Sequence, residues 1–254
     1  MDQLNYRSTG TGVPLVLLPG FCEDLSIWDA ILPELSQQCN LITIDLPGIG
    51  GSDHLPAPTS VTRIAKQVHE FTQSLDIQEY IVAGHSLGGY ISLELAKLYP
   101  ESILGIGLIH STAFADDNEK IKSRNKTIDF VRKRGVEAFI KSFVPQLFSN
   151  KESLNIEKVI DMAKQTPIES LVSYTVAMKN RQDYTTMLRN WAKPVMFVAG
   201  QNDTLIPIEK SRAHRDFIQE QNIIELPEIG HMGMYEAPLE TIKALSALVW
   251  TISK

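Results

Sequence analysis

The sequence predicts an α/β fold, with a mostly parallel, doubly wound sheet and an inserted helical cap. Three observations carry this prediction. Short, continuous apolar segments recur along the chain, as buried parallel strands require. Amphipathic segments with helical spacing separate several of them, and this alternation covers both faces of a parallel sheet. The alternation stops between residues 111 and 187, where only helical patterns occur.

Six apolar segments are expected to form the parallel strands. Each is short, and the first two end at turns that contain Pro-Gly. Residues 3–7 are expected to add an antiparallel strand at the edge of the sheet. In chain order, the six segments are residues 15–18, 41–44, 81–83, 103–109, 195–198 and 223–226.

Two helices of the expected core are clearest. Apolar residues recur at helical spacing over residues 64–75, after the candidate N-cap residues Thr59 and Ser60. A second helical pattern covers residues 242–252, after Pro238 at a suitable first helical position.

The long segment without strands is expected to form a cap. We predict that residues 1–110 and 188–254 form the core, and that residues 111–187 form a helical cap inserted between two βα units. Packing against the core is the alternative role for each aromatic residue of the cap. We assign Phe139 and Phe143 to substrate binding. The full set of aromatic candidates for a pocket is Phe130, Phe139, Phe143 and Phe148.

Length and composition fit one soluble domain with an insertion. The chain has 254 residues, of which 43% are hydrophobic and 21% are charged. Its net charge of −6 argues against a nucleic-acid surface, which needs clustered positive charge. We find no signal-peptide pattern and no apolar run of the ~18 residues that a membrane helix needs. We therefore expect a cytoplasmic protein without nucleic-acid or membrane partners.

The two cysteines, Cys22 and Cys39, show no metal-type spacing, and no metal-binding or phosphate-binding motif is present. We expect two reduced thiols, with a single disulfide as the alternative. Neither a metal nor a cofactor is expected.

Residues 84–88, with the sequence Gly-His-Ser-Leu-Gly, lie between a β-branched apolar run and a helix-like run. A Gly-x-Ser-x-Gly at a strand-to-helix turn predicts a nucleophile elbow. The turn is so sharp that larger residues in place of its glycines would collide with the strand and the helix. We expect Ser86 to project above the sheet and the N–H of Leu87 to face a substrate oxyanion. An ordinary turn between strand and helix is the alternative.

A serine nucleophile needs a base and a carboxylate that orients the base. Asp203 follows the expected strand at residues 195–198, and His231 follows the one at residues 223–226. Residues just beyond the carboxyl ends of parallel strands converge on one edge of the sheet. We therefore expect Ser86, Asp203 and His231 to form a catalytic triad.

Each of these assignments has an alternative. Asp203 is also suited to an Asx-turn, and His231 to a structural role. Asp116, which follows the expected strand at residues 103–109, is the reserve candidate for the acid. We expect His85 to pack beside the elbow. Surface roles are expected for the three histidines without a neighbouring motif, His54, His69 and His214.

The second oxyanion donor should come from the loop after the first buried strand. That loop reads Pro19-Gly20-Phe21, in which Gly20 permits a close backbone approach. The N–H of Phe21 is the expected donor. A plain Pro-Gly turn is the alternative.

Along nearly its whole length the chain resembles the α/β-hydrolase superfamily, in its capped esterase and enol-lactonase-like branch. The chain order Ser, Asp, His is the order of that family. This chain departs from the family at two places. The family often has His-Gly where this chain has Pro19-Gly20, and it often has Gly-His-Gly where this chain has Gly-Ile-Gly at residues 48–50. Neither change removes a proposed catalytic group. The segments that carry the resemblance are residues 14–21, Trp28 with Leu32 and Leu35, and residues 45–52, 84–89, 200–203 and 230–231.

The resemblance implies a serine hydrolase that cleaves a small or medium carboxylic ester or lactone through an acyl-enzyme. In this family Ser86 would attack the carbonyl, His231 would carry the proton and Asp203 would orient the histidine. The N–H groups of Phe21 and Leu87 would bind the oxyanion. Carbon–carbon bond hydrolysis, perhydrolysis or a lyase step on the same triad stays open, as does a receptor with residual activity. Acyl length, natural substrate and oligomeric state stay open too.

Overall fold

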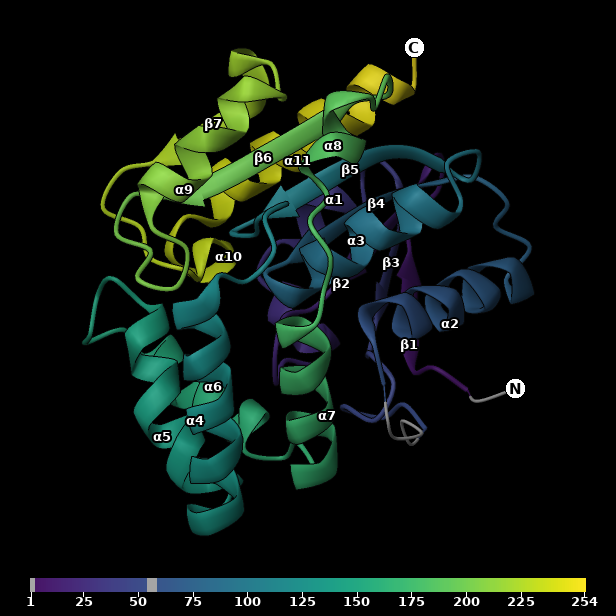
Figure 1. The fold of residues 1–254 in the computed structure, drawn as a ribbon. Helices are drawn as coiled ribbons and strands as arrows, with labels where there is room; N and C mark the ends of the chain where they lie inside the picture. Colours follow the sequence, from purple (N-terminus) through teal and green to yellow (C-terminus); the bar gives the residue numbers. More distant parts are fainter. Residues whose placement is uncertain (1–2, 54–58) are drawn as a thin grey trace.

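The computed structural model describes residues 3–53 and 59–254 of the chain. Its centre is a seven-stranded sheet in the order β1-β3-β2-β4-β5-β6-β7 (Figure 1). β1 pairs antiparallel with β3, and every other neighbouring pair is parallel, which confirms the predicted fold class. The strands are β1 (Tyr6–Thr9), β2 (Pro14–Leu18), β3 (Asn40–Ile44), β4 (Tyr80–His85), β5 (Ile103–Ile109), β6 (Val195–Gly200) and β7 (Ile223–Leu226).

Strand β4 lies in the middle of the sheet, between β2 and β5. Its register places Gly84 opposite Leu18 and His85 opposite Ile109, so that three strands end at nearly the same level. All six residues of β4 are buried, as its continuous apolar sequence predicts. The residue that follows β4 therefore lies at the centre of the carboxyl edge, where ligands bind in open α/β sheets.

Helices cover both faces of the sheet (Figure 1). Val16 and Leu18 of β2 pack in one apolar cluster with residues of α2 and α3, whereas Leu15 and Leu17 pack in the other with residues of α1 and α11. This alternation follows from the period of two along a strand. The core helices are α1 (Leu32–Leu35), α2 (Val61–Ser74), α3 (Leu87–Leu98), α9 (Ile208–Arg212), α10 (Gly233–Glu236) and α11 (Pro238–Ile252), with short 3₁₀ turns at Leu25–Trp28, Ala213–Asp216 and Glu220–Asn222.

The segment between β5 and β6 is helical and contains no strand among its described residues. Figure 1 shows its long helices projecting together from one side of the sheet. The division into a core and a cap at residues 111 and 187 stays a prediction. The helices of this segment are α4 (Asn118–Arg134), α5 (Val136–Leu147), α6 (Asn155–Ala163), α7 (Ile168–Lys179) and α8 (Thr185–Arg189).

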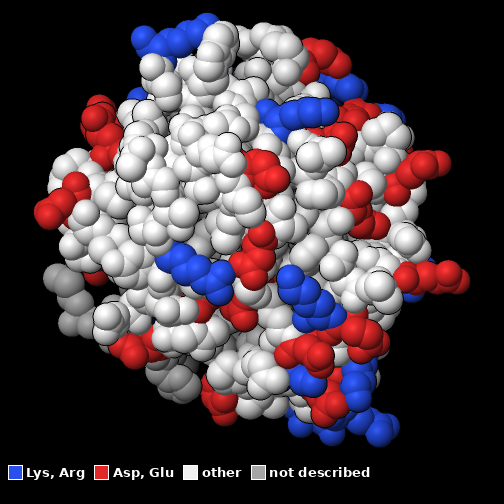
Figure 2. Space-filling view, turned by 180° about the vertical axis from the view of Figure 1, so that it is seen from behind, with Lys and Arg blue, Asp and Glu red and all other residues white. Residues whose placement is uncertain are grey.

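The surface carries charges of both signs. On the face shown in Figure 2, Lys and Arg side chains lie among Asp and Glu side chains. None of the helices in the described parts of the chain has both the length and the apolar character needed to cross a bilayer. The cytoplasmic location and the absence of a nucleic-acid partner stay predictions from the sequence.

Candidate active site

Ser86 lies in a strained turn between β4 and α3, with φ of 48° and ψ of −108°. The strand next to it holds the turn: the Ser86 N–H donates to the Ile109 carbonyl at 2.9 Å, and the Ser111 hydroxyl donates to the Ser86 carbonyl at 2.8 Å. A non-glycine residue with positive φ persists where the surroundings determine its conformation. The geometry is that of the predicted elbow.

The two glycines of the elbow are required by close backbone contacts. A Cβ atom on Gly84 would lie 2.0 Å from the Gly88 carbonyl carbon. A Cβ atom on Gly88 would lie 2.2 Å from the Leu18 carbonyl oxygen. Both distances are far below van der Waals contact, so helix α3 can approach the sheet this closely only without side chains at these positions.

Asp203 and His231 meet beside the elbow, although 28 residues separate them in the chain. The His231 Nδ1 atom lies 2.6 Å from Asp203 Oδ2, and both side chains are 2% exposed. Asp203 Oδ1 accepts hydrogen bonds from the N–H groups of Leu205 and Ile206, at 2.8 and 3.0 Å. The loop thus aims the second carboxylate oxygen at the histidine ring. Oδ1 also forms the Asx-turn weighed as an alternative, so the two roles coexist.

The Asp203 carboxyl is held ionised by its neighbours. Burial alone would raise its pKa, but the rings of His231 and His110 outweigh burial and hold the pKa well below its ordinary value. Burial also lowers the pKa of His110 to about 4, so this ring is neutral near pH 7. A carboxylate facing a buried imidazole ring stabilises the protonated form that a general base acquires during catalysis.

Ser86 and His231 line one cavity of about 530 Å³. Within the described residues, the Ser86 hydroxyl makes no hydrogen bond to the His231 ring. Hydrogen bonds between a nucleophile and its base are often long in the absence of substrate. The structure therefore brings Asp203 and His231 into direct contact and places Ser86 in the same cavity.

The two expected oxyanion donors are free backbone N–H groups. Leu87 is the first residue of α3, so its N–H has no acceptor within the helix. The Phe21 N–H donates to no residue in the ranges that the structure describes. Leu87 directly follows Ser86, and Phe21 lines the same cavity as Ser86, so both N–H groups are able to donate to an oxygen bound there.

A buried pair, Glu23 and His85, connects the loops around Ser86. Glu23 Oε2 accepts the Gly20 N–H at 2.6 Å and lies 2.8 Å from His85 Nδ1. His85 Nε2 lies 2.8 Å from the carbonyl oxygen of His231, which can only accept a hydrogen bond. An oxygen faces each ring nitrogen, and this geometry favours a proton on both nitrogens of His85. Burial would lower the pKa of His85, but Glu23 raises it overall.

The sequence did not predict this pair. The sequence predicts only that His85 packs beside the elbow, and it gives no signal for Glu23. The Gly20 N–H is bound by Glu23, which leaves the next N–H, that of Phe21, for a ligand. The chain thus has a carboxylate anchor for the loop in which Pro19 replaces the histidine that is common in the resembled family.

Two of the four candidate aromatic residues line the cavity. Phe139 and Phe143 of α5 stack on each other with ring centroids 5.0 Å apart, and both make edge-to-face contacts with Phe21, at interplanar angles of 69° and 80°. Phe148 is instead buried in an apolar cluster, and Phe130 is 41% exposed. The alternative of packing therefore holds for Phe148, whereas Phe130 neither lines the cavity nor is buried.

Asp116, the reserve candidate for the acid, is engaged elsewhere. Its carboxylate oxygens lie 2.7 Å from Arg181 Nη1 and 3.2 Å from Arg124 Nε. Asp203, by contrast, contacts His231 directly. The geometry therefore favours Asp203 as the partner of the histidine.

Only one group of potential metal ligands was found in the described ranges, namely His110, Asp203 and His231. The direct hydrogen bond between His231 and Asp203 already uses two atoms that a metal would need. The arrangement thus fits a proton-carrying pair. Cys22 and Cys39 are both buried free thiols.

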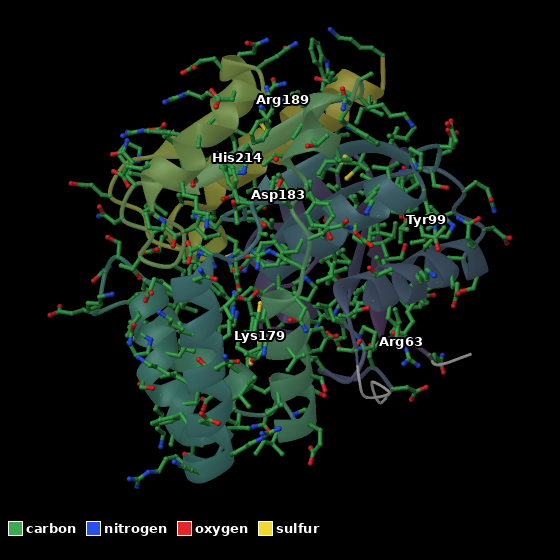
Figure 3. All side chains as sticks on the ribbon, viewed as in Figure 1. Arg63, Tyr99, Lys179, Asp183, Arg189 and His214 are labelled. Atoms are coloured by element: carbon green, nitrogen blue, oxygen red, sulfur yellow. The ribbon has the colours of Figure 1, made fainter. Side chains whose placement is uncertain are left out.

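The expectation of a surface role for His214 was wrong. Figure 3 shows this residue beside β6, and its side chain is fully buried. His214 Nε2 accepts the Ala113 N–H at 2.9 Å, and Nδ1 faces the carbonyl oxygens of Lys210 and Ser211. His214 thus joins the chain after β5 to helix α9. His54, also expected at the surface, lies outside the described residues.

Comparison with known proteins decides the family. Residues 13–238 match the family described as the alpha/beta hydrolase fold. The chain belongs to this family. The matched range includes the elbow, the Asp203 loop and the His231 loop.

Solved α/β-hydrolase structures resemble this chain over nearly its full length. A thermophilic esterase from Thermogutta terrifontis is 26% identical, with a TM-score of 0.92 over 99% of this chain and 94% of that one. The enol-lactonase from Burkholderia xenovorans is 20% identical, with a TM-score of 0.84 over 99% of this chain and 96% of that one. The second likeness shows the shared fold. The resemblance to esterases and an enol-lactonase that the sequence indicated is confirmed.

One curated relative of this chain is a longer protein. It is the dihydrolipoyllysine-residue acetyltransferase component of the acetoin cleaving system from Pseudomonas putida, 30% identical over 232 residues. The match covers 89% of this chain and 60% of the relative. The chain thus spans 60% of the length of that protein.

Proposed function

We propose that this member of the α/β-hydrolase family is a serine hydrolase of small or medium carboxylic esters or lactones. The observation that carries the proposal is the contact of Asp203 with His231, which lines the same cavity as Ser86. The likeness to an esterase, at 26% identity, supports the choice of an ester substrate.

The proposed reaction proceeds through an acyl-enzyme. Ser86 Oγ attacks the ester carbonyl while His231 takes the serine proton, and Asp203 stabilises the resulting imidazolium. The N–H groups of Phe21 and Leu87 bind the developing oxyanion. His231 then protonates the leaving alkoxide, and the alcohol departs. A water molecule, deprotonated by His231, releases the acid and restores Ser86.

A fluorophosphonate probe and a substrate series test this proposal. We expect the probe to label Ser86, located by mass spectrometry of the labelled peptide. We expect Ser86→Ala to lower the turnover of p-nitrophenyl esters by about 10⁴-fold or more, because triad members act as a unit. Unchanged circular dichroism shows that the variant is folded. Labelling of another residue, or near-native turnover by the variant, would contradict the proposal.

Product analysis separates ester hydrolysis from the other reactions of the fold. Hydrolysis of an alkyl ester releases one acid and one alcohol in equal amounts. Cleavage of a carbon–carbon bond releases no alcohol from such a substrate. We expect equal amounts of acid and alcohol from native enzyme, measured by chromatography.

A further inference from the structure

The cavity beside Ser86 has a wall with excess positive charge. Lys120 and Arg124 of α4 and Arg181 after α7 line it, together with Asp116. The side chains of Asp116 and Arg181 are 2% and 1% exposed, and that of Arg124 is 16% exposed. Three cations therefore face one buried carboxylate. Charges that are largely removed from water need a partner of opposite sign.

The other acidic residues that line the cavity do not balance this wall. Glu23 lies against His85. Glu119 pairs with Lys122 at the surface, where its side chain is 84% exposed, and the side chain of Asp117 is 67% exposed. Exposed carboxylates are screened by water and contribute little to a buried site.

Arg181 is occupied by the protein itself. It donates to Asp116 Oδ1 at 2.7 Å and to the carbonyl oxygens of Met178 and Phe114 at 2.9 and 2.8 Å. Its guanidinium carbon lies 4.0 Å from the centre of the Tyr90 ring. These contacts use both terminal nitrogens of Arg181, and only its buried Nε atom lacks an acceptor among the described residues.

Arg124, unlike Arg181, has terminal N–H groups without an acceptor among the described residues. Its Nε atom donates to Asp116 Oδ2 at 3.2 Å, which orients the guanidinium plane. No residue in the described ranges accepts a hydrogen bond from its two terminal nitrogens. A fixed guanidinium fork with free donors matches the two oxygens of a carboxylate or a phosphate.

Lys120 adds a second charge beside this fork. Its Nζ atom donates to the Leu205 carbonyl at 3.1 Å, which uses one of its three donors. Burial and the charge of Arg124 lower the pKa of the Lys120 ammonium, as expected in a region of positive potential.

The charged wall borders the proposed catalytic residues. The loop that Lys120 contacts includes the Leu205 N–H that binds Asp203. Tyr90, which packs on Arg181, follows Ser86 by one turn of α3. A single molecule in a cavity of about 530 Å³ can therefore place an ester at Ser86 and an anionic group on this wall.

We propose that Arg124 and Lys120 form a subsite for an anionic oxygen group, so that the preferred substrates are esters or lactones that also carry a carboxylate or a phosphate. The proposal rests on the serine-hydrolase function proposed above. The apolar wall with Phe139 and Phe143 then holds the carbon chain between the two polar ends.

A pair of matched esters tests the subsite. The mono-p-nitrophenyl ester of glutaric acid carries a carboxylate, and p-nitrophenyl pentanoate has the same chain length without one. We expect native enzyme to favour the anionic ester by about tenfold or more in kcat/KM, as charge-assisted hydrogen bonds suggest. Arg124→Gln should lower this preference by about the same factor. Lys120→Gln should lower it as well.

Lys122→Gln is the matched control, because Lys122 lies on the exposed side of the same helix with its side chain 67% exposed. The control should keep the native ratio. Inhibition of pentanoate hydrolysis by glutarate or by inorganic phosphate tells which anion the subsite prefers. Added salt should weaken the preference for the charged ester.

Two results would overturn the subsite. One is equal kcat/KM for the two esters in native enzyme. The other is an unchanged ratio in Arg124→Gln with a native melting temperature; if that variant does not fold, Lys120→Gln decides in the same way. If instead the proposed serine-hydrolase function were wrong, Ser86→Ala would hydrolyse both esters at the native rate. This result differs from both results above.

Discussion

Ser86, Asp203 and His231 come from three separate loops, and each loop holds its residue by backbone hydrogen bonds. The Ser86 N–H donates to the carbonyl oxygen of Ile109 in β5, and the His231 N–H donates to the Leu147 carbonyl at 2.7 Å. The Asp203 carboxylate is oriented by the N–H groups of its own turn. Positions fixed in this way lose little freedom when substrate binds, which favours catalysis by preorganised groups.

Replacement of the two candidate acids distinguishes their roles. We expect Asp203→Asn to lower kcat by about 10³-fold or more, because the amide favours the wrong histidine tautomer. Asp116→Asn should lower kcat far less than Asp203→Asn does. It should also lower the melting temperature, because it removes the negative charge that neutralises the buried Arg181. Steady-state kinetics and thermal unfolding of both variants check this. Equal or reversed losses of kcat would remove Asp203 from the triad.

Glu23→Gln tests the anchor of the oxyanion loop. The amide can still accept the Gly20 N–H, but His85 loses its counter-charge. We expect kcat to fall by about tenfold or more with a smaller change in KM, because the loop binds the oxyanion more than the ground state. Rate measurements on a p-nitrophenyl ester give both constants. If kcat and KM changed by the same factor, or if the variant kept native rates, the Glu23–His85 pair would have only a structural role.

Glu34→Gln is the control for this change. Glu34 is an exposed acidic residue of α1, away from the loop. The control should keep both constants native. A direct spectroscopic readout comes from the ring nitrogens of His85, which nuclear magnetic resonance should show doubly protonated near pH 7 in the native protein.

At the scale of the elements, the elbow depends on how closely α3 packs on the sheet. Gly84 and Gly88 permit backbone contact, and Gly89 makes room for the Ser111 side chain, 2.2 Å from where its Cβ atom would lie. The N-terminus of α3 thus points at the cavity with Leu87 first. A helix N-terminus carries partial positive charge, which favours an oxyanion there.

Phe143→Ala tests the role of helix α5. If Phe143 shapes the acyl pocket, as its place in the cavity indicates, the change opens space and shifts kcat/KM toward longer acyl chains. One or two methylenes are worth ~1–3 kcal/mol at most. A p-nitrophenyl ester series on native and variant enzyme measures the shift. A parallel profile with a lowered melting temperature would mean that Phe143 only packs the helices.

Phe130→Ala on helix α4 serves as the control for this series. Its side chain is 41% exposed and lies outside the set that lines the cavity. The chain-length profile of this variant should match the native one. A shift in both variants would point to a general loosening of the inserted helices.

Local patterns predicted the elements and the order of the candidate triad but not the pairs between distant loops. The residues of β4 before the elbow form a continuous apolar run because both faces of the strand are buried. Such a run can be recognised in the sequence without knowing which segments pack against it. The contact of Glu23 with His85 joins residues 62 positions apart, and nothing in either segment indicates it. His214 was misjudged for the same reason, since its partner Ala113 lies 101 positions away.

At the scale of the whole molecule, buried neutral histidines make stability depend on pH. Burial lowers the pKa of His214 from 6.5 to about 4, and its Nε2 atom accepts a hydrogen bond only when unprotonated. Between pH 6.5 and about 4, His214 is protonated in the unfolded chain but stays neutral in the folded chain. The free energy of unfolding therefore falls as the pH falls from about 6.5 to 4.

His214→Gln should flatten this dependence. The amide oxygen can accept the Ala113 N–H but does not titrate, so the variant should lose ~3 kcal/mol less between pH 6.5 and 4 than native protein. Urea unfolding at several pH values measures the free energies. Identical pH dependence in the two proteins would show that His214 is not the titrating group.

The pairing of β5 with β6 has a consequence for how such a protein diversifies. The chain leaves the sheet after Ile109 and re-enters at Val195, and these strands are direct neighbours, with Ile106 opposite Val195. Because the two strands are parallel, the chain leaves at the carboxyl end of β5 and returns to the amino end of β6. Only the part of the insertion that projects beyond the carboxyl edge can therefore change in length without disturbing the register of a strand. A different set of helices beyond this edge would reshape the cavity wall that Phe139 and Phe143 line, while the strands and the loops that hold Ser86, Asp203 and His231 stay the same.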